Sequence, residues 1–581
     1  MTMLRYYQDE MRYLHEAGKA FAESHPEEAA FLNVGSLTDR DPYVERLFEG
    51  FAFLTARIRE RLDDELPQYT DGLLSLLWPH LLRPVPALSI VEFKPIAGLV
   101  QQTTSLPRGS EVRSLPVGDE NTVCRFTTTQ EVRLQPVRLV DVAMAWPSEG
   151  TSTATLRFHL DRGVTFSRLS PSPLRLYFHA EPSVASLMHL FFTRHVDRLT
   201  LRPLGGGDAR TLQGQRWIAP GGLGESEGLV PYSPHTFHGF RLLQEYLAFR
   251  QKFWFVDLLG LDQLAATDKM TDFEVEIAFD RSYPENRRFG ASSLRLFCTP
   301  VVNLFSHEAE PLRVNHLDSE YEVVPDVHRP RTVEVYDVEQ VAGVEDHTGK
   351  RHDYRPYFAF RHGPGRPRWY TVSHRASADG RPHSHLALGG GDVETLRTET
   401  ISLRLRCTNG SLPREALQEK SITQPSPELP RIATFENLTQ PTNDLQPPLA
   451  RHEDLYWRLL SHLSVGHRTV AGRDGLADLL AVHDWTDGEA NARRIAGIRG
   501  VSWKAKEIVR RRAPVRGAEV VVEVRDDHFS EEGDLCLFGA VLSRVFSAYA
   551  TVNSFVHLTV IAVPSGRRYE WEPPTGEGTL L

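Results

Sequence analysis

Three His-Glu dipeptides are the first place in this sequence where metal chemistry could arise. They begin at His15, His307 and His452. A zinc-protease helix carries a second histidine four residues after the first, so that both imidazoles reach one metal ion. The positions four residues on hold Lys19, Pro311 and Tyr456. The dipeptides therefore do not predict a zinc protease.

Residues 343–350 have glycine and lysine in the order of a phosphate-binding loop. That loop requires four residues between its glycines and a Ser or Thr after the lysine. Here five residues separate Gly343 from Gly349, and Arg351 follows Lys350. We interpret the segment as an ordinary loop. The chain also shows no GxSxG elbow between a strand and a helix, and no GxGxxG motif that opens a βαβ unit.

His383 and His385, with His374 nearby in sequence, could hold a metal ion if a carboxylate joined them. Their segment is rich in glycine, serine and arginine, so we favour exposed loop histidines. The four cysteines are far apart in sequence and have the character of buried apolar residues: Cys124, Cys298, Cys407 and Cys536. We expect no catalytic residue, no metal and no organic cofactor.

The charge and length of the chain bound its function. A formal net charge of −10 and a pI of about 6.2 disfavour a protein that coats nucleic acid or anionic lipid. No stretch approaches the roughly 18 apolar residues of a membrane span, and residues 1–10 lack a secretory pattern. A chain of 581 residues, 41% of them hydrophobic, is expected to form about two to four domains. We expect a cytoplasmic protein that inserts into no membrane and binds no nucleic acid.

One basic segment stands out in this acidic chain. Nine basic side chains between residues 493 and 516 are balanced only by Glu507: Arg493, Arg494, Arg499, Lys504, Lys506, Arg510, Arg511, Arg512 and Arg516. Such a run forms either a solvated face or a docking surface for an acidic partner. We favour the solvated face, because exposed charge runs rarely contribute measurable binding.

Residues 1–90 have the apolar spacing of helices, with residues that recur every three or four positions in two stripes. The first stripe includes Tyr7, Met11, Leu14 and Phe21, and the second consists of Val44, Leu47, Phe51, Leu54 and Ile58. This near-heptad period suits helix-on-helix packing. Two interpretations stay open, an internal helical hairpin or a bundle with a partner chain. These nine residues are the candidate partner-binding residues.

The middle of the chain alternates apolar and polar residues, which predicts half-buried antiparallel strands in sandwiches or barrels. The alternation is clearest around residues 156–160, 174–178, 273–279 and 401–405. Helical inserts are expected near residues 184–195 and 239–264. We predict a β-rich domain over 91–270 and a second one over 271–412.

Residues 413–450 are rich in proline and predict an extended strap that could act as a hinge. After it, helical and strand patterns alternate, with helices expected at 453–463, 474–483 and around 535–549 and strands expected at 518–524 and 554–563. This order predicts an α+β domain over 451–581. The predicted fold class is therefore multidomain α+β, with a helical N-terminal region, a β-rich middle and an α+β C-terminal domain.

A composite pattern runs through residues 6–11 (YYQDEM) and 41–74 (DPYVERLFEGFAFLTARIRERLDDELPQYTDGLL), and continues through 79–86 (PHLLRPVP). These segments resemble the TssF (VasA/ImpG) family of the type VI secretion baseplate. Later segments follow in the family's order: residues 299–305 (TPVVNLF), 405–410 (LRCTNG), 457–463 (WRLLSHL) and 538–542 (FGAVL). The similarity covers the whole chain and is loosest over about 95–270.

The resemblance implies a structural wedge component with no known catalytic residue. Two copies would join one TssG and contact each other, and the wedge would recruit TssK and TssE around the VgrG hub to nucleate tube and sheath. The assembly would lie in the bacterial cytoplasm, docked to the inner-membrane complex.

The residues alone leave a second function class open, a carbohydrate-active β-sandwich enzyme. The strand-rich middle with its scattered Trp, His and Asp residues suggests it. An assembly subunit should purify in one stable complex with its partners, whereas an enzyme should purify alone. We favour the assembly subunit.

Overall fold

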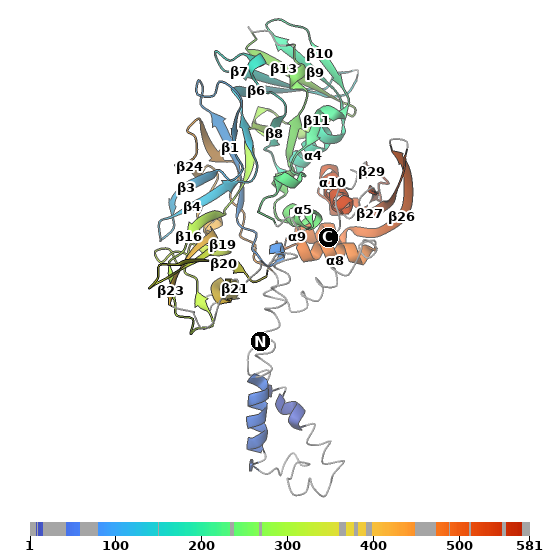
Figure 1. Ribbon diagram of the computed structural model, residues 1–581. Coiled ribbons are helices and arrows are strands. Elements are labelled where there is room, and N and C mark those ends of the chain that lie inside the picture. Colours follow the sequence, from blue (N-terminus) through green and yellow to red (C-terminus); the bar gives the residue numbers. More distant parts are fainter. Residues whose placement is uncertain are drawn as a thin grey trace. The chain divides into compact units, whose positions relative to one another are not determined.

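The computed structural model describes residues 7–8, 10–15, 42–43, 45–57, 79–148, 150–232, 237–265, 270–358, 368–376, 382–390, 398–447, 472–486, 488–510, 513–548 and 554–571 (Figure 1). The chain divides into two compact units. One contains residues 1–78 and 358–360, and the other contains the rest.

The first unit is helical where it is described. Helical residues run over 10–15 and 45–57. The two segments are joined by His15, whose Nε2 lies 2.9 Å from Glu45 Oε1 and whose ring centroid lies 6.2 Å from that of Phe48. Ala52 and Ala56 are fully buried, so the longer helix has an inward face.

The second unit is built mainly from antiparallel sheets. A six-stranded sheet has the order β24 (Ile422–Pro425), β3 (Glu111–Val117), β4 (Thr122–Thr128), β15 (Cys298–Val302), β1 (Leu88–Pro95) and β25 (Ala433–Asn437). A five-stranded sheet has the order β10 (Arg210–Gln213), β9 (Val196–Leu204), β13 (Asp272–Phe279), β7 (Thr153–Leu160) and β6 (Val137–Ala145). A four-stranded sheet contains β11 (Ile218–Pro220), β12 (Phe255–Leu258), β8 (Leu174–Phe178) and β14 (Leu294–Leu296).

An eight-stranded sheet lies further along the chain. Its order is β16 (Phe305–Glu308), β23 (Glu399–Thr408), β19 (Glu334–Glu345), β20 (Arg351–Pro356), β21 (Arg368–Ala376), β22 (Pro382–Gly390) and β18 (Tyr321–Glu322), and β17 (Leu312–Val314) also pairs with β23. A small pair joins β2 (Thr104–Leu106) to β5 (Val132–Leu134). The predicted alternation is confirmed, because residues such as Leu156, Phe158 and Val275 are fully buried within their strands.

The proline-rich segment differs from the expected strap. Its residues form β24 and β25, which pair with β3 and β1 in the six-stranded sheet. Both strands are the outermost of that sheet. Proline is tolerated at a sheet edge because one side of the strand needs no ladder hydrogen bond, and Pro425 ends β24 there. The proline-rich segment therefore supplies the edge strands of a sheet and is not a linker between domains.

Strand pairing also crosses the predicted boundary between residues 270 and 271. β13 begins just after residue 270, yet its two neighbours β7 and β9 come from before it. The second helical insert is shorter than expected, since α5 (His238–Ala248) is followed by the strand β12. The first insert is α4 (Pro182–Arg194), close to its predicted range.

The α+β fold predicted for the C-terminal region is confirmed. It contains α8 (Arg473–His483), α9 (Glu489–Ala496) and α10 (Glu532–Ala548), with a sheet of β26 (Ile498–Arg510), β27 (Ala513–Arg525), β28 (Phe555–Val563) and β29 (Arg568–Trp571). α10 packs on α4 and α5 (Figure 1). Gly533 is needed at this contact, because an added Cβ would overlap the Ser186 carbonyl oxygen. The expected helix over residues 453–463 lies outside the described residues.

No helix among the described residues combines the length and apolar character needed to cross a bilayer.

The buried imidazole of His189 on α4 predicts a loss of stability in acid. Burial lowers its pKa to about 4, and its Nε2 has no hydrogen-bond partner among the described residues. Between pH 6.5 and 4 the unfolded chain binds a proton that the folded chain excludes, so stability falls as the pH falls. This group alone should remove about 3 kcal/mol over that range. In denaturant titrations, His189→Met should lose correspondingly less stability than the natural chain, and equal losses would contradict this assignment.

Candidate functional site

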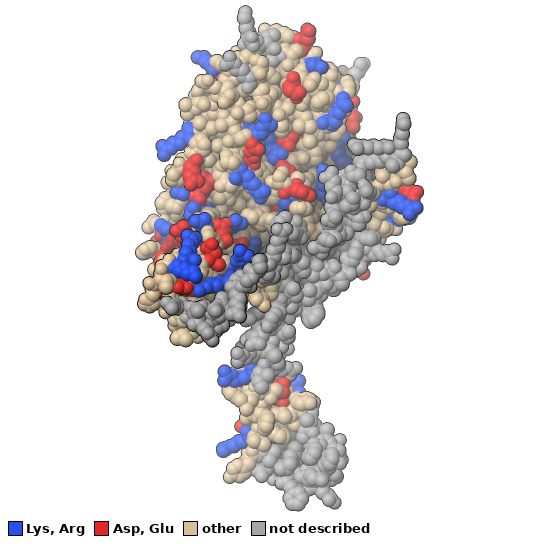
Figure 2. Space-filling view, viewed as in Figure 1, with Lys and Arg blue, Asp and Glu red and all other residues tan. Residues whose placement is uncertain are grey.

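The exposed apolar stripe of the first unit is the most unusual surface that the structure describes. Leu47, Phe51 and Leu54 are 59%, 58% and 60% exposed, and Tyr43, one turn earlier, is 81% exposed. Spacings of four and three place these residues on one side of the helix. On the face seen in Figure 2, the described part of this unit is tan with a few Lys, Arg, Asp and Glu side chains. Large apolar side chains gathered at one place on a surface are typical of a protein-binding site.

The inward face of the same helix is formed by other residues. Ala52 and Ala56 are both 0% exposed. At about 100° per residue, Ala52 lies roughly 140° around the helix from Leu47. The buried side of this helix is therefore formed by small residues, and the described part of the predicted second stripe is left exposed. The sequence pattern places Ala52 beside the second stripe and does not single out Ala56, because alanine adds little to an apolar pattern.

The remaining candidate residues of the first unit divide into two groups. Tyr7, Met11 and Leu14 are half-buried. Phe21, Val44 and Ile58 lie outside the described residues. The structure therefore brings together Leu47, Phe51 and Leu54 as an exposed set, which we call the helix stripe.

A cluster of buried charges lies in the eight-stranded sheet. Glu399 is 0% exposed and accepts hydrogen bonds from Tyr354 and from Arg368, whose Nη1 lies 3.1 Å from each carboxylate oxygen. His316 Nε2 lies 2.8 Å from Glu399 Oε1, and Arg368 also reaches Glu345. Burial and the neighbouring Glu399 raise the pKa of Tyr354, so its hydroxyl stays a donor. Each carboxylate is satisfied within the cluster, which cross-links β19, β20, β21 and β23.

Replacing Glu399 by glutamine is expected to destabilise the protein by about 3 kcal/mol, because Arg368 would lose its buried counter-charge and keep only the longer contact with Glu345. Guanidinium unfolding measures the change. Glu339→Gln is the matched control, since its partner Arg406 is more exposed and the pair should contribute much less. Equal effects of the two substitutions would show that the cluster is not a buried stabilising network.

The histidines singled out as metal candidates do not converge. His374 pairs with Ser384 across β21 and β22, so the two side chains share one face of the sheet. His383 and His385 lie on the opposite face by the same alternation. His383 Nδ1 lies 2.8 Å from Glu322 Oε1. Among the described residues no group of three His, Cys, Asp or Glu side chains could hold a metal ion, and the four cysteines are buried and free.

The basic segment is split by the fold. Arg494 is buried and donates to Asp534 through Nε and Nη2, and Arg493 donates to the Asp527 carbonyl. The remaining basic residues fall on or between β26 and β27. Lys506 and Arg516 are paired with Glu519 and Glu507. Among the described residues, three of the nine basic side chains are therefore paired with a carboxylate of the chain itself: Arg494, Lys506 and Arg516.

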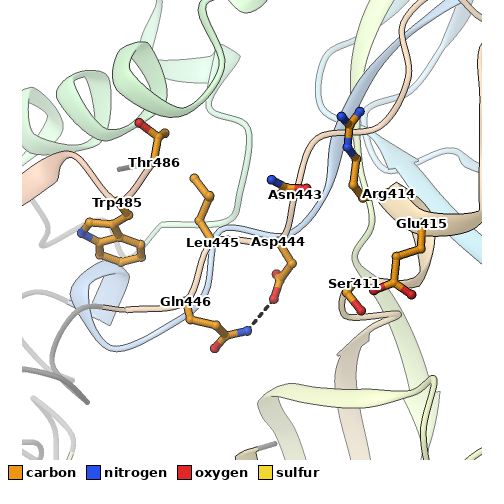
Figure 3. Close-up of a pocket in the computed structure, with 9 residues that line it drawn as sticks. All are labelled: Ser411, Arg414, Glu415, Asn443, Asp444, Leu445, Gln446, Trp485 and Thr486. Atoms are coloured by element: carbon orange, nitrogen blue, oxygen red, sulfur yellow. Dashed lines mark hydrogen bonds between the residues drawn. The ribbon is translucent and has the colours of Figure 1, made fainter. Parts of the chain in front are cut away.

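One cavity of about 330 Å3 lies in the second unit (Figure 3). It is lined by Ser411, Arg414, Glu415, Asn443, Asp444, Leu445, Gln446, Trp485 and Thr486. These residues come from α6 (Leu412–Ala416) and the turn before it, from the segment after β25, and from the loop after α8. Sequence reasoning singled out none of them, because three segments that are distant in sequence meet there.

Comparison with known proteins gives consistent matches. The family model described as "Type VI secretion system, TssF" matches residues 1–578. The type VI secretion system component TssF1 of Pseudomonas aeruginosa is 27% identical, over 99% of this chain and 98% of its own length. A solved TssK-TssF-TssG baseplate subcomplex contains a chain with a TM-score of 0.80 and 36% identity, covering 91% of this chain and 98% of that one. A solved type VI secretion baseplate complex contains one with a TM-score of 0.63 and 31% identity, covering 98% and 99%.

The family model and the relatives span nearly the whole chain, as the first-unit segments and the later segments quoted above had indicated. The carbohydrate-active enzyme reading has no support from any of these matches. The chain belongs to the TssF family and is a component of the type VI secretion system baseplate.

Proposed function

We propose that this chain is a wedge subunit that binds TssG and TssK and that it performs no catalysis. The observation that carries the proposal is the helix stripe, whose residues are about 60% exposed while the opposite face of their helix is buried. The similar chains in solved structures belong to a TssK-TssF-TssG subcomplex and a baseplate complex. A helix with one buried face and one exposed apolar face suits a bundle completed by partner helices.

The remaining parts of the proposal follow from family membership. Two copies of the chain join one TssG and contact each other in the wedge, which recruits TssE and surrounds the VgrG hub. The assembly lies in the bacterial cytoplasm and docks to the inner-membrane complex. No cofactor, nucleic acid or membrane insertion takes part. Basic and acidic side chains are interspersed on the described surface in Figure 2, which suits protein contacts better than a polyanion.

Native mass spectrometry tests the composition of the wedge. The chain, co-expressed with TssG and TssK of the same bacterium, is expected to give one complex with two copies of the chain per TssG. A single partner chain offers two identical sites only if it repeats internally, so the two copies should sit in different surroundings. A complex with one copy per TssG would contradict the stoichiometry, and purification of the chain alone would contradict the assembly role.

A further inference from the structure

The hairpin of β26 and β27 continues as a two-stranded ribbon beyond the rest of its sheet (Figure 1). β27 has β28 as its second neighbour over residues 517–525, whereas its pairing with β26 continues to Ala513. Among the described residues, 507–510 and 513–516 therefore have no third strand beside them. A ribbon of two strands is marginally stable in water and gains stability from a third strand or a packed face. The end of this hairpin therefore lacks a neighbour.

β26 is the outermost strand of the C-terminal sheet, and most of its outer side is accessible. Its ladder to β27 uses one side of the strand, so every second residue presents its N–H and C=O groups to the other side. At the start of β26, Arg473 Nε donates to the Ile498 carbonyl oxygen at 3.1 Å. Further along, Lys504 and Ala505 are exposed and Val509 is 78% exposed. A partner strand can therefore pair with β26 from residue 504 onward.

The two faces of this part of β26 differ in chemistry. By strand alternation Lys504 and Lys506 lie on one face, whereas Ala505 and Val509 lie on the other. Lys506 Nζ lies 2.8 Å from Glu519 Oε1 on β27, and Lys504 has no ion pair among the described residues. A strand that alternates acidic and apolar side chains would match both faces, because its side chains also point to opposite faces in turn.

The charge of the ribbon favours an acidic partner over a second copy of this chain. Residues 504–516 contain six Lys or Arg residues and one acidic residue, Glu507, in a chain whose net charge is −10. Glu507 is itself paired with Arg516, with Oε1 2.9 Å from Nε. If β26 paired with β26 of another copy, basic side chains would face one another and repel. An acidic strand meets no such repulsion.

We propose that β26 receives an extended acidic segment of a partner protein, which adds a strand to the C-terminal sheet along residues 504–510. Carboxylates of the segment lie beside Lys504 and Lys506, and its apolar side chains lie beside Val509. Main-chain hydrogen bonds supply the affinity, and the alternating side chains supply the specificity. This surface is separate from the helix stripe, and the proposal does not depend on binding of TssG.

Calorimetry and hydrogen exchange on the full chain test this surface with three capped peptides. The first alternates Glu and Val, the second alternates Lys and Val, and the third alternates Glu and Pro, which keeps the charge but prevents strand pairing. Only the first is expected to bind, and its affinity should fall as NaCl rises from about 50 to 500 mM, because salt screens exposed charges. On binding, the amides of β26 should gain protection from exchange, whereas those of β20 should not change.

Lys504→Glu and Val509→Asp should each weaken binding of the first peptide by about tenfold. Both side chains are exposed, so thermal unfolding should show folded proteins. Lys350→Glu reverses an exposed lysine elsewhere and should bind normally.

Four results would each overturn the proposal. They are equal binding of the Glu-Val peptide and either control peptide, undiminished binding by either variant, unchanged protection of β26, and no binding of any peptide. Tighter binding of duplex DNA than of the Glu-Val peptide would also contradict it, since the ribbon would then be a site for polyanions. Protection of β26 that grows with protein concentration alone would assign the edge to a second copy instead. None of these outcomes bears on co-purification with TssG.

Discussion

Replacing Leu47 and Phe51 together by aspartate is expected to abolish co-purification of this chain with TssG. Each large apolar side chain contributes about 1.5–3 kcal/mol when a partner covers it. A carboxylate forced into the same contact loses its water and costs further free energy. A combined loss on the order of 5 kcal/mol weakens a complex by several thousand-fold. A micromolar complex would no longer survive purification.

The exposure of the two residues makes this test selective for binding. Both are more than half exposed within the chain, so their replacement should leave the unfolding transition of the isolated protein in place. Arg46→Glu changes a charge on the same helix outside the helix stripe and serves as the matched control. Leu47→Met with Phe51→Leu keeps the contact apolar and should retain binding. A folded aspartate variant that binds TssG at the natural level would move the contact to Met11 and Leu14.

The helix stripe shows what a spacing pattern can establish. Apolar residues at intervals of three and four predicted a helix and one apolar side, and both are present over the described residues. The same pattern could not decide whether that side faces inward. The structure decides it, because Ala52 and Ala56 are buried on the other side of the helix while the stripe itself is exposed.

In the β-rich middle of the chain, the sequence pattern predicted where strands lie but not which strands pair. Alternation located β7, β8, β13 and β23 well, because a half-buried strand carries its own period. Which strands pair is decided by contacts between distant segments, so β1 joins β15 and β25 across hundreds of residues. For the same reason the residues that line the cavity carried no signal, since three segments that are distant in sequence meet there.

The strand pairing also argues against the hinge expected in the proline-rich segment. With β24 and β25 held in the six-stranded sheet, a change of direction there would break ladder hydrogen bonds. The C-terminal sheet is in addition held through α10, which packs on α4 and α5. Arg194 of α4 also stacks on Trp571 of β29, with its Cζ atom 4.3 Å from the centroid of the indole ring. We therefore expect the two copies in a wedge to superpose across this region.

Replacing Asp534 by alanine is expected to destabilise the protein by about 3–5 kcal/mol. Its side chain is 1% exposed and accepts hydrogen bonds from Arg494 Nη2 at 2.8 Å and from Arg250 Nη1 at 3.1 Å. Although burial opposes its ionisation, these arginines hold the pKa of Asp534 below its usual value. Without the carboxylate, Arg494 would remain buried with an unbalanced charge, and α10 would lose its link to the turn after α5.

Guanidinium unfolding measures the loss, and hydrogen exchange shows where it falls. Protection of α10 should decrease more than that of the eight-stranded sheet, because Asp534 joins α9 and α10 to Arg250 and takes no part in that sheet. Asp527→Ala is the matched control, since Asp527 is exposed and pairs only with its neighbour Arg525 among the ion pairs of the described residues, so the midpoint should not move. If Asp534→Ala unfolds at the natural midpoint with α10 fully protected, the buried ion pair does not fix the C-terminal region, and the superposition expected of the two copies loses its physical basis.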